Sequence, residues 1–458
     1  MTAIKTAIDQ GTSIVQGLTR SWGSADAVML YLDRCQVETP DRLVKSLWNR
    51  IDRRRAKIDK VVDFGAGDGR LARGGAFRRY VGYEIDPRRS HGVVLPRNVS
   101  LLHQCAFSEP LHDADLCVGN PPYVRNQDLP EGWRQRAAEA VLNRTGVKLS
   151  GLSNAWQYFF LLSLASAKTD GLVALIIPYE WVSRPSAAAL RAYIEKQRWR
   201  VEVYRLRDDS FDRVLTTSSI TLVDKSIRSG RWSFFEETDS GVYKKLATAS
   251  GGTAGVVAYT RRKSMSTQLR AKRGLSPGTQ GVLTLTEGER ARAGLRIGSD
   301  VVRCITSLRN IDEDRTVLTI SEFNDCYRDV GAKCWLIRTD REPSERLSAY
   351  LGDVPPEKYQ TATCLSRDEW WKFAMPEIPD LVVATGFRGE RPKIAQNLIG
   401  AYAVGSVAGI YGADHPRRII EKIRKMNFSV SVVAHSKGLK KLEINQLNTV
   451  LGGLDDDQ

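Results

Sequence analysis

Short apolar segments alternate with helical segments through roughly the first half of this 458-residue chain. Apolar residues at helical spacing predict helices over 155–168 and 187–197. Segments of strand length that end at glycine, proline or charged residues predict seven strands: 60–64, 80–85, 99–105, 115–119, 172–177, 201–206 and 219–223. Alternation of this kind predicts an α/β fold built on a Rossmann-like, mostly parallel, doubly wound sheet of seven strands.

A second domain is expected after residue 230, because 458 residues exceed the usual size of a single core. From about Arg231 onward, glycine-rich and serine/threonine-rich stretches mix with short β-like runs and isolated helical segments. We therefore predict an α/β domain over residues 1–230 and a mixed α+β domain over residues 231–458.

The charge balance favours a polyanionic partner, since 68 Lys and Arg residues against 53 Asp and Glu residues leave a net charge of +15. Seven scattered cysteines form no Cys-x-x-Cys pair, and the five histidines are equally dispersed, so neither a metal site nor a disulfide framework is expected. Charged residues interrupt the N-terminal segment, and no apolar stretch has membrane-spanning length. The expectation is a cytoplasmic protein with no membrane contact.

A glycine-rich turn, Asp63-Phe64-Gly65-Ala66-Gly67-Asp68-Gly69, follows the first predicted strand. Glycines let such a turn run tightly, so that a ligand can approach the backbone. The second strand ends in Glu84-Ile85, and a carboxylate at that tip can accept hydrogen bonds from both hydroxyls of a ribose. The turn alone is equally typical of a dinucleotide site or an ordinary loop, but the pair predicts a ribose-bearing cofactor.

The fourth predicted strand ends in Asn120-Pro121-Pro122-Tyr123. The two prolines fix the backbone and leave free carbonyl acceptors, and Asn120 adds a side-chain carbonyl. Two acceptors can hold both hydrogens of an exocyclic amine, which directs the nitrogen lone pair toward an electrophile. The Tyr123 ring can stack on a planar base. A Pro-Pro turn that merely caps a strand is the alternative, but the carboxyl end of a strand after a cofactor turn is a ligand site by position.

These motifs together resemble those of the gamma-class N6-adenine DNA methyltransferases of restriction-modification type, whose signature is Asn-Pro-Pro-Tyr. The resemblance covers about residues 30–225, with the motifs in the order typical of that class. It implies S-adenosyl-L-methionine as cofactor. The matching cofactor-binding positions are Glu38, Thr39, Pro40, Asp63, Gly65, Ala66, Gly67, Glu84, Ile85 and Phe107.

The resemblance implies transfer of a methyl group to an adenine flipped out of double-stranded DNA. Asn120 and the Pro121 carbonyl would hold the amine, Pro122 would complete the turn, and Tyr123 and Phe211 would stack on the base. No metal is needed. The family's C-terminal domain reads the target sequence, so residues 231–458 would be the target-recognition domain, and any restriction endonuclease would be a separately encoded partner.

Three positively charged stretches in the C-terminal half are candidate phosphate contacts or solvated surface: Arg261-Arg262-Lys263, Arg270, and Lys272-Arg273. Three short segments loosely resemble pieces of recognition domains in related enzymes: Leu275–Thr279, Trp370–Lys372 and Lys440–Ile444. No recognition sequence follows from them.

One position departs from the family pattern, because Ala106 stands where an aspartate usually accepts the amino group of the cofactor's adenine. Its absence would weaken cofactor binding by roughly 1–3 kcal/mol unless Cys105, Ser108 or Glu109 compensates. Three other functions stay open on the sequence: a protein-glutamine methyltransferase, an RNA adenine methyltransferase, and a catalytically weak DNA-binding subunit of a modification system.

Overall fold

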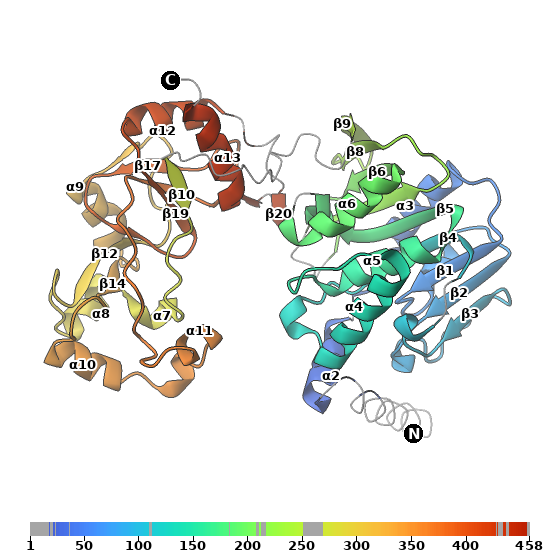
Figure 1. The fold of residues 1–458 in the computed structure, drawn as a ribbon, viewed down its shortest axis with the longest axis horizontal. Helices are drawn as coiled ribbons and strands as arrows, with labels where there is room; N and C mark the ends of the chain where they lie inside the picture. The colour runs from blue at the N-terminus through green and yellow to red at the C-terminus, as the bar shows by residue number, and fades with distance from the viewer. Residues whose placement is uncertain are drawn as a thin grey trace. The chain divides into compact units, whose positions relative to one another are not determined.

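The computed structural model describes residues 18, 22, 24–35, 37–109, 112–182, 184–207, 210–211, 217–250, 269–426, 428, 434–436 and 439–455. The chain forms two compact units (Figure 1): Met1–Val256 with Val433–Lys437, and Val257–Val432 with Gly438–Gln458. The structure thus places the boundary later than the predicted residue 230. No helix within the described ranges is long and apolar enough to cross a membrane.

The first unit is built on one nine-stranded sheet with the strand order β3-β2-β1-β4-β5-β7-β6-β8-β9. Its strands are β1 (Lys60–Phe64), β2 (Arg79–Tyr83), β3 (Val99–Leu102), β4 (Ala114–Gly119), β5 (Ala167–Pro178), β6 (Arg200–Arg205), β7 (Ser218–Asp224), β8 (Arg231–Glu237) and β9 (Tyr243–Ser250). Strands β1 to β5 run parallel, whereas β7 is antiparallel to both β5 and β6. The predicted α/β class and a largely parallel sheet are confirmed.

All seven predicted strands are present, and β8 and β9 extend the sheet beyond them. β8 pairs in parallel with β6, and β9 pairs antiparallel with β8, so residues 231–250 belong to the first unit. Trp232 and Phe234 of β8 are buried in the same core as the predicted strands. The character change at Arg231 therefore marks the start of two added strands and not a domain boundary.

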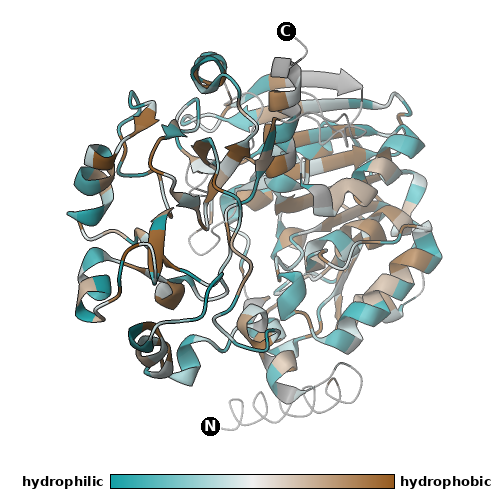
Figure 2. Ribbon diagram, turned by 60° about the vertical axis from the view of Figure 1, so that its left-hand side comes forward, coloured by the Kyte–Doolittle hydropathy of each residue, from teal (hydrophilic) through white to brown (hydrophobic). Residues whose placement is uncertain are grey.

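Helices cover the two faces of this sheet unequally. On one face lie α2 (Ala25–Arg34), α4 (Glu131–Thr145), α5 (Ala155–Ser166) and α6 (Ala188–Gln197), packed on alternate strand residues such as Val62, Cys117 and Val173. On the other face α3 (Asp41–Asp52) packs on the intervening residues, among them Val61 and Leu116. Figure 2 shows apolar residues concentrated in the strands, where both faces are covered.

The strands that the structure describes in the second unit are short and form several small sheets, and this unit has a buried apolar core of its own. β10, β19, β15, β17 and β13 form a five-stranded sheet, β11, β14, β12 and β18 form a four-stranded sheet, and β16 pairs with β21. Thr286 and Thr319 each cap a short helix through a Thr-x-x-Glu capping box.

The elements of this unit, in chain order, are β10 (Arg270–Lys272), α7 (Gln280–Leu283), β11 (Thr284–Leu285), α8 (Glu287–Arg292), β12 (Val301–Ile305), β13 (Val317–Leu318), α9 (Ile320–Phe323), β14 (Trp335–Ile337), α10 (Glu345–Gly352), α11 (Ala362–Leu365), β15 (Leu381–Ala384), β16 (Gly386–Phe387), β17 (Ile394–Asn397), β18 (Tyr402–Ala403), β19 (Val407–Tyr411), α12 (Pro416–Lys425), β21 (Leu439–Lys441) and α13 (Ile444–Asp455). β20 (Ala434–Ser436) lies in the short segment assigned to the first unit.

Candidate functional site

The glycine-rich turn after β1 is fastened to the end of β2. The backbone N–H groups of Gly65 and Ala66 both donate to the Tyr83 carbonyl, at 2.8 and 2.9 Å. Gly65 has φ +85°, which a residue with a side chain rarely adopts. A Cβ at Gly65 would lie 3.7 Å from the Pro122 ring, so the turn closely approaches the Asn-Pro-Pro-Tyr segment.

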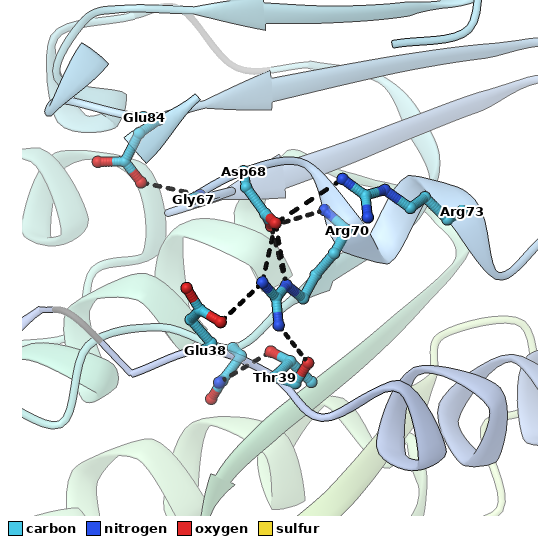
Figure 3. A network of polar contacts seen from close by, with 8 residues as sticks. Glu38, Thr39, Gly67, Asp68, Arg70, Arg73 and Glu84 are labelled. Carbon is cyan, nitrogen blue, oxygen red and sulfur yellow. Dashed lines mark hydrogen bonds and ion pairs between the residues drawn. The ribbon is translucent and has the colours of Figure 1, made fainter. Parts of the chain in front are cut away.

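Glu84, just beyond β2, uses both carboxylate oxygens to hold backbone N–H groups. Its Oε2 accepts from the Gly67 N–H at 2.8 Å (Figure 3). Its Oε1 accepts from the Asp86 N–H at 2.9 Å. Burial raises the pKa of Glu84, while these two hydrogen bonds oppose the rise. Each oxygen retains a further lone pair, so the group can still accept hydrogen bonds from a ligand.

Asp63 is fully buried, although it carries a carboxylate. The Tyr80 hydroxyl donates to its Oδ2, while its Oδ1 has no hydrogen-bond partner among the described residues. Burial raises the pKa of Asp63 to about 7, with the nearby Glu84 carboxylate contributing in the same direction. An unpaired buried oxygen is costly, which makes this atom a candidate for contact with a donor group on a ligand.

Arg70, in the 3-10 turn η1 (Arg70–Arg73), ties the glycine turn to the segment before α3. Its guanidinium donates to Asp68, to the Thr39 carbonyl at 3.0 Å and to the Glu38 carboxylate at 2.9 Å. Figure 3 shows this guanidinium at the centre of the network. The sequence analysis missed Arg70. Its contacts with Glu38 and Thr39 span 32 and 31 residues, and only its closeness to Asp68 can be seen in the sequence.

Asn120 follows β4 and faces the same segment. Its side-chain nitrogen donates to the Thr39 hydroxyl at 3.0 Å, and Thr39 is itself only 5% exposed. This contact uses the NH2 group of the amide and leaves the carbonyl oxygen to act as a hydrogen-bond acceptor. The orientation of Asn120 therefore depends on a residue 81 positions earlier in the chain.

These groups line one cavity with about 790 Å³ of open space, counting its mouth. Eleven predicted site residues line it: Glu38, Thr39, Asp63, Gly65, Ala66, Gly67, Glu84, Ile85, Phe107, Asn120 and Pro122. Pro40, Pro121, Tyr123 and Phe211 are not among its lining residues. Pro40 caps the start of α3, and Pro121 is buried.

The two rings predicted to hold a base lie against different cores. Tyr123 packs on the core beneath α5, with its hydroxyl 3.4 Å from the Ser218 hydroxyl. Phe211 is 8% exposed and belongs to the core on the α3 side. Phe211 lies in the segment Ser210–Thr216, which resembles the family's segment that supplies a second aromatic ring against the base, and its residues 212–216 lie outside the described residues. The sandwich of a base between these rings stays a prediction.

An aromatic wall, which sequence reasoning missed, completes the cavity: Trp22, Tyr31, Trp133 and Phe159. Trp133 and Phe159 sit at helical spacing and therefore read as ordinary core residues in the sequence. Phe107 joins this wall, since its ring lies edge-on to both, at centroid distances of 5.4 and 5.0 Å. The wall is suited to a flat apolar group.

Ala106, the departure from the family pattern, also lines the cavity, and two polar neighbours lie beside it. Gln104 and Cys105 are lining residues, whereas Ser108 and Glu109 are not. The Ser108 hydroxyl instead accepts from Arg136 at 3.5 Å. Of the three compensating residues suggested by sequence, only Cys105 is in place, and Gln104 is an additional candidate.

The candidate phosphate contacts of the second unit are partly engaged in ion pairs. Arg270 and Lys272 lie 3.5 and 2.6 Å from the Glu377 carboxylate, and Arg273 lies 3.8 Å from Glu443. Arg261-Arg262-Lys263 lies outside the described residues.

Comparison with known proteins agrees with the motifs. Residues 106–210 match the model of the Eco57I restriction-modification methylase family. The Type II methyltransferase M.XamI of Xanthomonas campestris pv. amaranthicola is 28% identical over 221 residues, covering 44% of this chain and 41% of that protein. The Type II methyltransferase M.AccI of Acinetobacter calcoaceticus is 27% identical over 124 residues, covering 27% of this chain and 22% of that protein.

The chain thus spans less than half the length of these curated relatives. Among solved structures, the Type IIL restriction-modification enzyme MmeI in complex with DNA has a similar fold. Its TM-score is 0.55 at 11% identity, over 88% of this chain and 62% of that one. These matches confirm the predicted resemblance: the chain is similar to the methyltransferases of restriction-modification systems.

Proposed function

We propose that this protein is a DNA methyltransferase that transfers a methyl group from S-adenosyl-L-methionine to the exocyclic N6 of adenine. The observation that carries the proposal is the position of Asn120-Pro121-Pro122-Tyr123 at the carboxyl end of β4, beside a cavity lined by Asp63 and Glu84. The similarity to Type II methyltransferases supports DNA as the substrate.

The lining residues fit S-adenosyl-L-methionine by their donor and acceptor chemistry. Glu84 offers acceptors to two ribose hydroxyls, and the unpaired Asp63 Oδ1 offers one to an ammonium or an N–H group. The wall that contains Phe107 suits the flat adenine ring. Bound there, the cofactor would supply an electrophilic methyl group.

The chain's own residues prepare the nucleophile. Thr39 holds the NH2 end of the Asn120 amide, so the Asn120 carbonyl and the Pro121 carbonyl would accept the two hydrogens of the adenine amine. An amine held in this way loses conjugation with the ring, and its lone pair becomes available for attack. Tyr123 and Phe211 would stack on the flipped base, at about 1–3 kcal/mol per base.

Double-stranded DNA is the proposed partner, with the second unit reading its sequence and a separately encoded endonuclease as the counterpart in a restriction-modification system. Support comes from the net charge of +15 and from the names of the matched relatives. The MmeI structure contains DNA bound to that enzyme. Its similarity to this chain is one of fold, and the fold similarity is what supports the proposal.

The test is expression in a host that lacks adenine methylation, followed by modification-sensitive sequencing of its DNA. We expect N6-methyladenine at one sequence motif with the wild-type protein. Asn120→Ala should reduce transfer by about 10²–10³-fold, as loss of a preorganised polar group does in other enzymes. Cofactor affinity should change little, since the role proposed for Asn120 is to hold the adenine amine and not the cofactor. Methylated RNA or glutamine with unmodified DNA would overturn the proposal.

A further inference from the structure

A second groove of the first unit is lined by residues of α3, β6, β8 and β9 and of the loop between β8 and β9. It has about 1740 Å³ of open space, counting its solvent-filled mouth. Its lining includes the half-buried rings Tyr204, Phe235 and Tyr243. Tyr204 and Phe235 stack with centroids 4.5 Å apart and planes inclined by 11°, while Tyr243 meets Tyr204 edge-on at 5.4 Å. These rings form an ordered aromatic floor.

Positive side chains of α3 and the residue after it form one wall of the groove. Arg42, Lys45, Asn49 and Arg53 are all exposed and follow one another at intervals of three or four residues, which places them along one helix face. At 1.5 Å per residue, Arg42 and Arg53 are separated by roughly 16 Å along the helix axis. The cations are therefore spread along the groove instead of converging on one point.

Arg50 adds a fixed positive charge above the aromatic floor. Its guanidinium lies 4.4 Å from the Tyr204 ring centre and 4.0 Å from that of Tyr243. Both contacts have cation–π geometry, which orders the side chain before any ligand binds. Burial lowers the pKa of Arg50, but an arginine stays charged at neutral pH.

Negative charge in the groove is limited to Glu237 and Asp239. Glu237 lies 3.6 Å from Arg42 and also accepts from the Arg207 backbone N–H at 3.1 Å. The Asp239 backbone carbonyl accepts from the Arg207 side chain at 3.1 Å. Lys45 and Arg53 have no ion-pair partner within the described residues. Five cations therefore line the groove beside two carboxylates, and Lys45 and Arg53 form no ion pair with either carboxylate.

The groove opens at the same edge of the sheet as Asn120. α3 begins directly after Thr39 and Pro40, and Thr39 contacts Asn120. Arg207 follows the carboxyl end of β6, which runs in the same direction as β4 because β7 is antiparallel to both β5 and β6 and β5 is parallel to β4. Arg42 and Arg207 are thus the groove residues next to the proposed catalytic edge, and Arg53 is the most distant from it.

We propose that this α3 groove binds the phosphodiester backbone of the DNA strand next to the target base. An array of cations about 16 Å long suits a polymer with one charge per roughly 3.4 Å of each strand, and a single phosphate would need converging donors. The naming of DNA rests on the proposed function. The groove would give the methyltransferase unit an affinity for DNA that does not depend on sequence.

The test compares two triple variants of the full chain that lose the same charge. The groove variant is Arg42→Ala, Lys45→Ala and Arg53→Ala. The control is Arg78→Ala, Arg97→Ala and Lys196→Ala, three exposed cations near the amino ends of β2, β3 and β6. Binding of a fluorescent 30-base-pair duplex of arbitrary sequence is measured across a salt series, and cofactor affinity checks folding.

The groove variant should bind the duplex at least tenfold more weakly than wild type. Its slope of log K against log salt should be shallower by about 2.7, at about 0.9 for each lost phosphate contact. The control should stay within about twofold on both measures. Equal losses in the two variants, or wild-type binding by the groove variant, would overturn the proposal. If the groove variant loses cofactor binding, Lys45→Glu alone replaces it, because Lys45 is exposed and unpaired.

Methylation assayed on the same preparations separates this proposal from the proposed function. A wild-type protein that does not methylate DNA, yet binds duplex through the groove, would contradict the function and support the groove. Methylation with unchanged DNA binding in the groove variant would contradict the groove alone. Stronger groove-dependent binding to an RNA duplex than to DNA would overturn the assignment of DNA.

Discussion

The two units bury different kinds of side chain. Among the described residues, the first unit buries six charged ones, and the second unit buries one, Asp300. The six are Asp63, Asp86, Arg191, Glu202, Asp224 and Lys225. Buried charge is costly, so its concentration in one unit indicates an interior arranged for more than stability. Most of it is paired, but Asp63 keeps an unpaired oxygen at the cavity.

The two units also differ in the length of their strands and the size of their sheets. The nine-stranded sheet of the first unit has strands of four to twelve residues, whereas the second unit has strands of two to five residues in small sheets. In long parallel strands the apolar middle is buried, and the polar residues that follow each strand meet at one edge of the sheet, which positions a site. In the second unit, charged side chains lie mostly at the surface, where packing does not determine their role. The comparison predicts that the first unit folds and binds cofactor by itself.

The largest expected effect comes from cutting the chain between the units. A chain ending after residue 256 keeps β8 and β9, whereas one ending after residue 230 loses Trp232, whose ring lies 5.3 Å from that of Trp181. Loss of one buried Trp costs about 3–5 kcal/mol, and here two whole strands go with it. We expect the longer chain to unfold cooperatively and bind cofactor, and the shorter one to do neither. Thermal unfolding measures the cooperativity, and calorimetry measures cofactor binding. If both chains unfold and bind alike, the boundary near residue 256 is wrong.

The second expected effect concerns the cost of burying Asp63. Its pKa rises to about 7 in the folded protein from an ordinary value near 3.8, so the folded state holds a proton that the unfolded state releases. Wild-type stability should therefore fall between about pH 4 and pH 7 and level off above. Asp63→Asn removes this loss. Its free energy of unfolding should be about 2–4 kcal/mol higher than that of wild type at pH 8 and nearly the same at pH 4. Denaturant titrations at the two pH values measure it, and a pH-independent difference would refute the cause given.

Sequence predicted the first unit well because its strands are long and regularly spaced. Asp63, Glu84 and Asn120 could be placed at one edge, since parallel strands end there together. β8 was missed because Arg231–Glu237 begins and ends with charged residues and follows a glycine. The Thr39–Asn120 contact spans 81 residues and leaves no local signal. In the second unit, strands of two or three residues are too short for periodicity to be read.

A third, smaller effect should distinguish Glu84, which lines the cavity, from the buried carboxylates that do not. Glu84→Ala removes an acceptor pair for hydroxyls and releases the N–H groups of Gly67 and Asp86. The cofactor dissociation constant should rise by about tenfold or more, since a charge-assisted hydrogen bond is worth roughly 1.5–3 kcal/mol. Calorimetry measures it, with Glu202→Gln as a control, because Glu202 is buried but does not line the cavity. Unchanged affinity in Glu84→Ala would refute the ribose-binding role.

The smallest effect is expected where the cavity departs from the family pattern, at Ala106. If the missing carboxylate is a real gap, Ala106→Asp should tighten cofactor binding several-fold, by about 1 kcal/mol for one added hydrogen bond. If Gln104 already supplies the acceptor, Gln104→Ala should weaken binding by a similar factor, and Ala106→Asp should then give no gain. The double variant Gln104→Ala with Ala106→Asp separates the two, because an aspartate that replaces the glutamine would restore wild-type affinity. Calorimetry of the three proteins decides between them. If neither single variant changes affinity, the cofactor's amino group has no partner at this part of the wall, and ring contact with Phe107 must hold the adenine by itself.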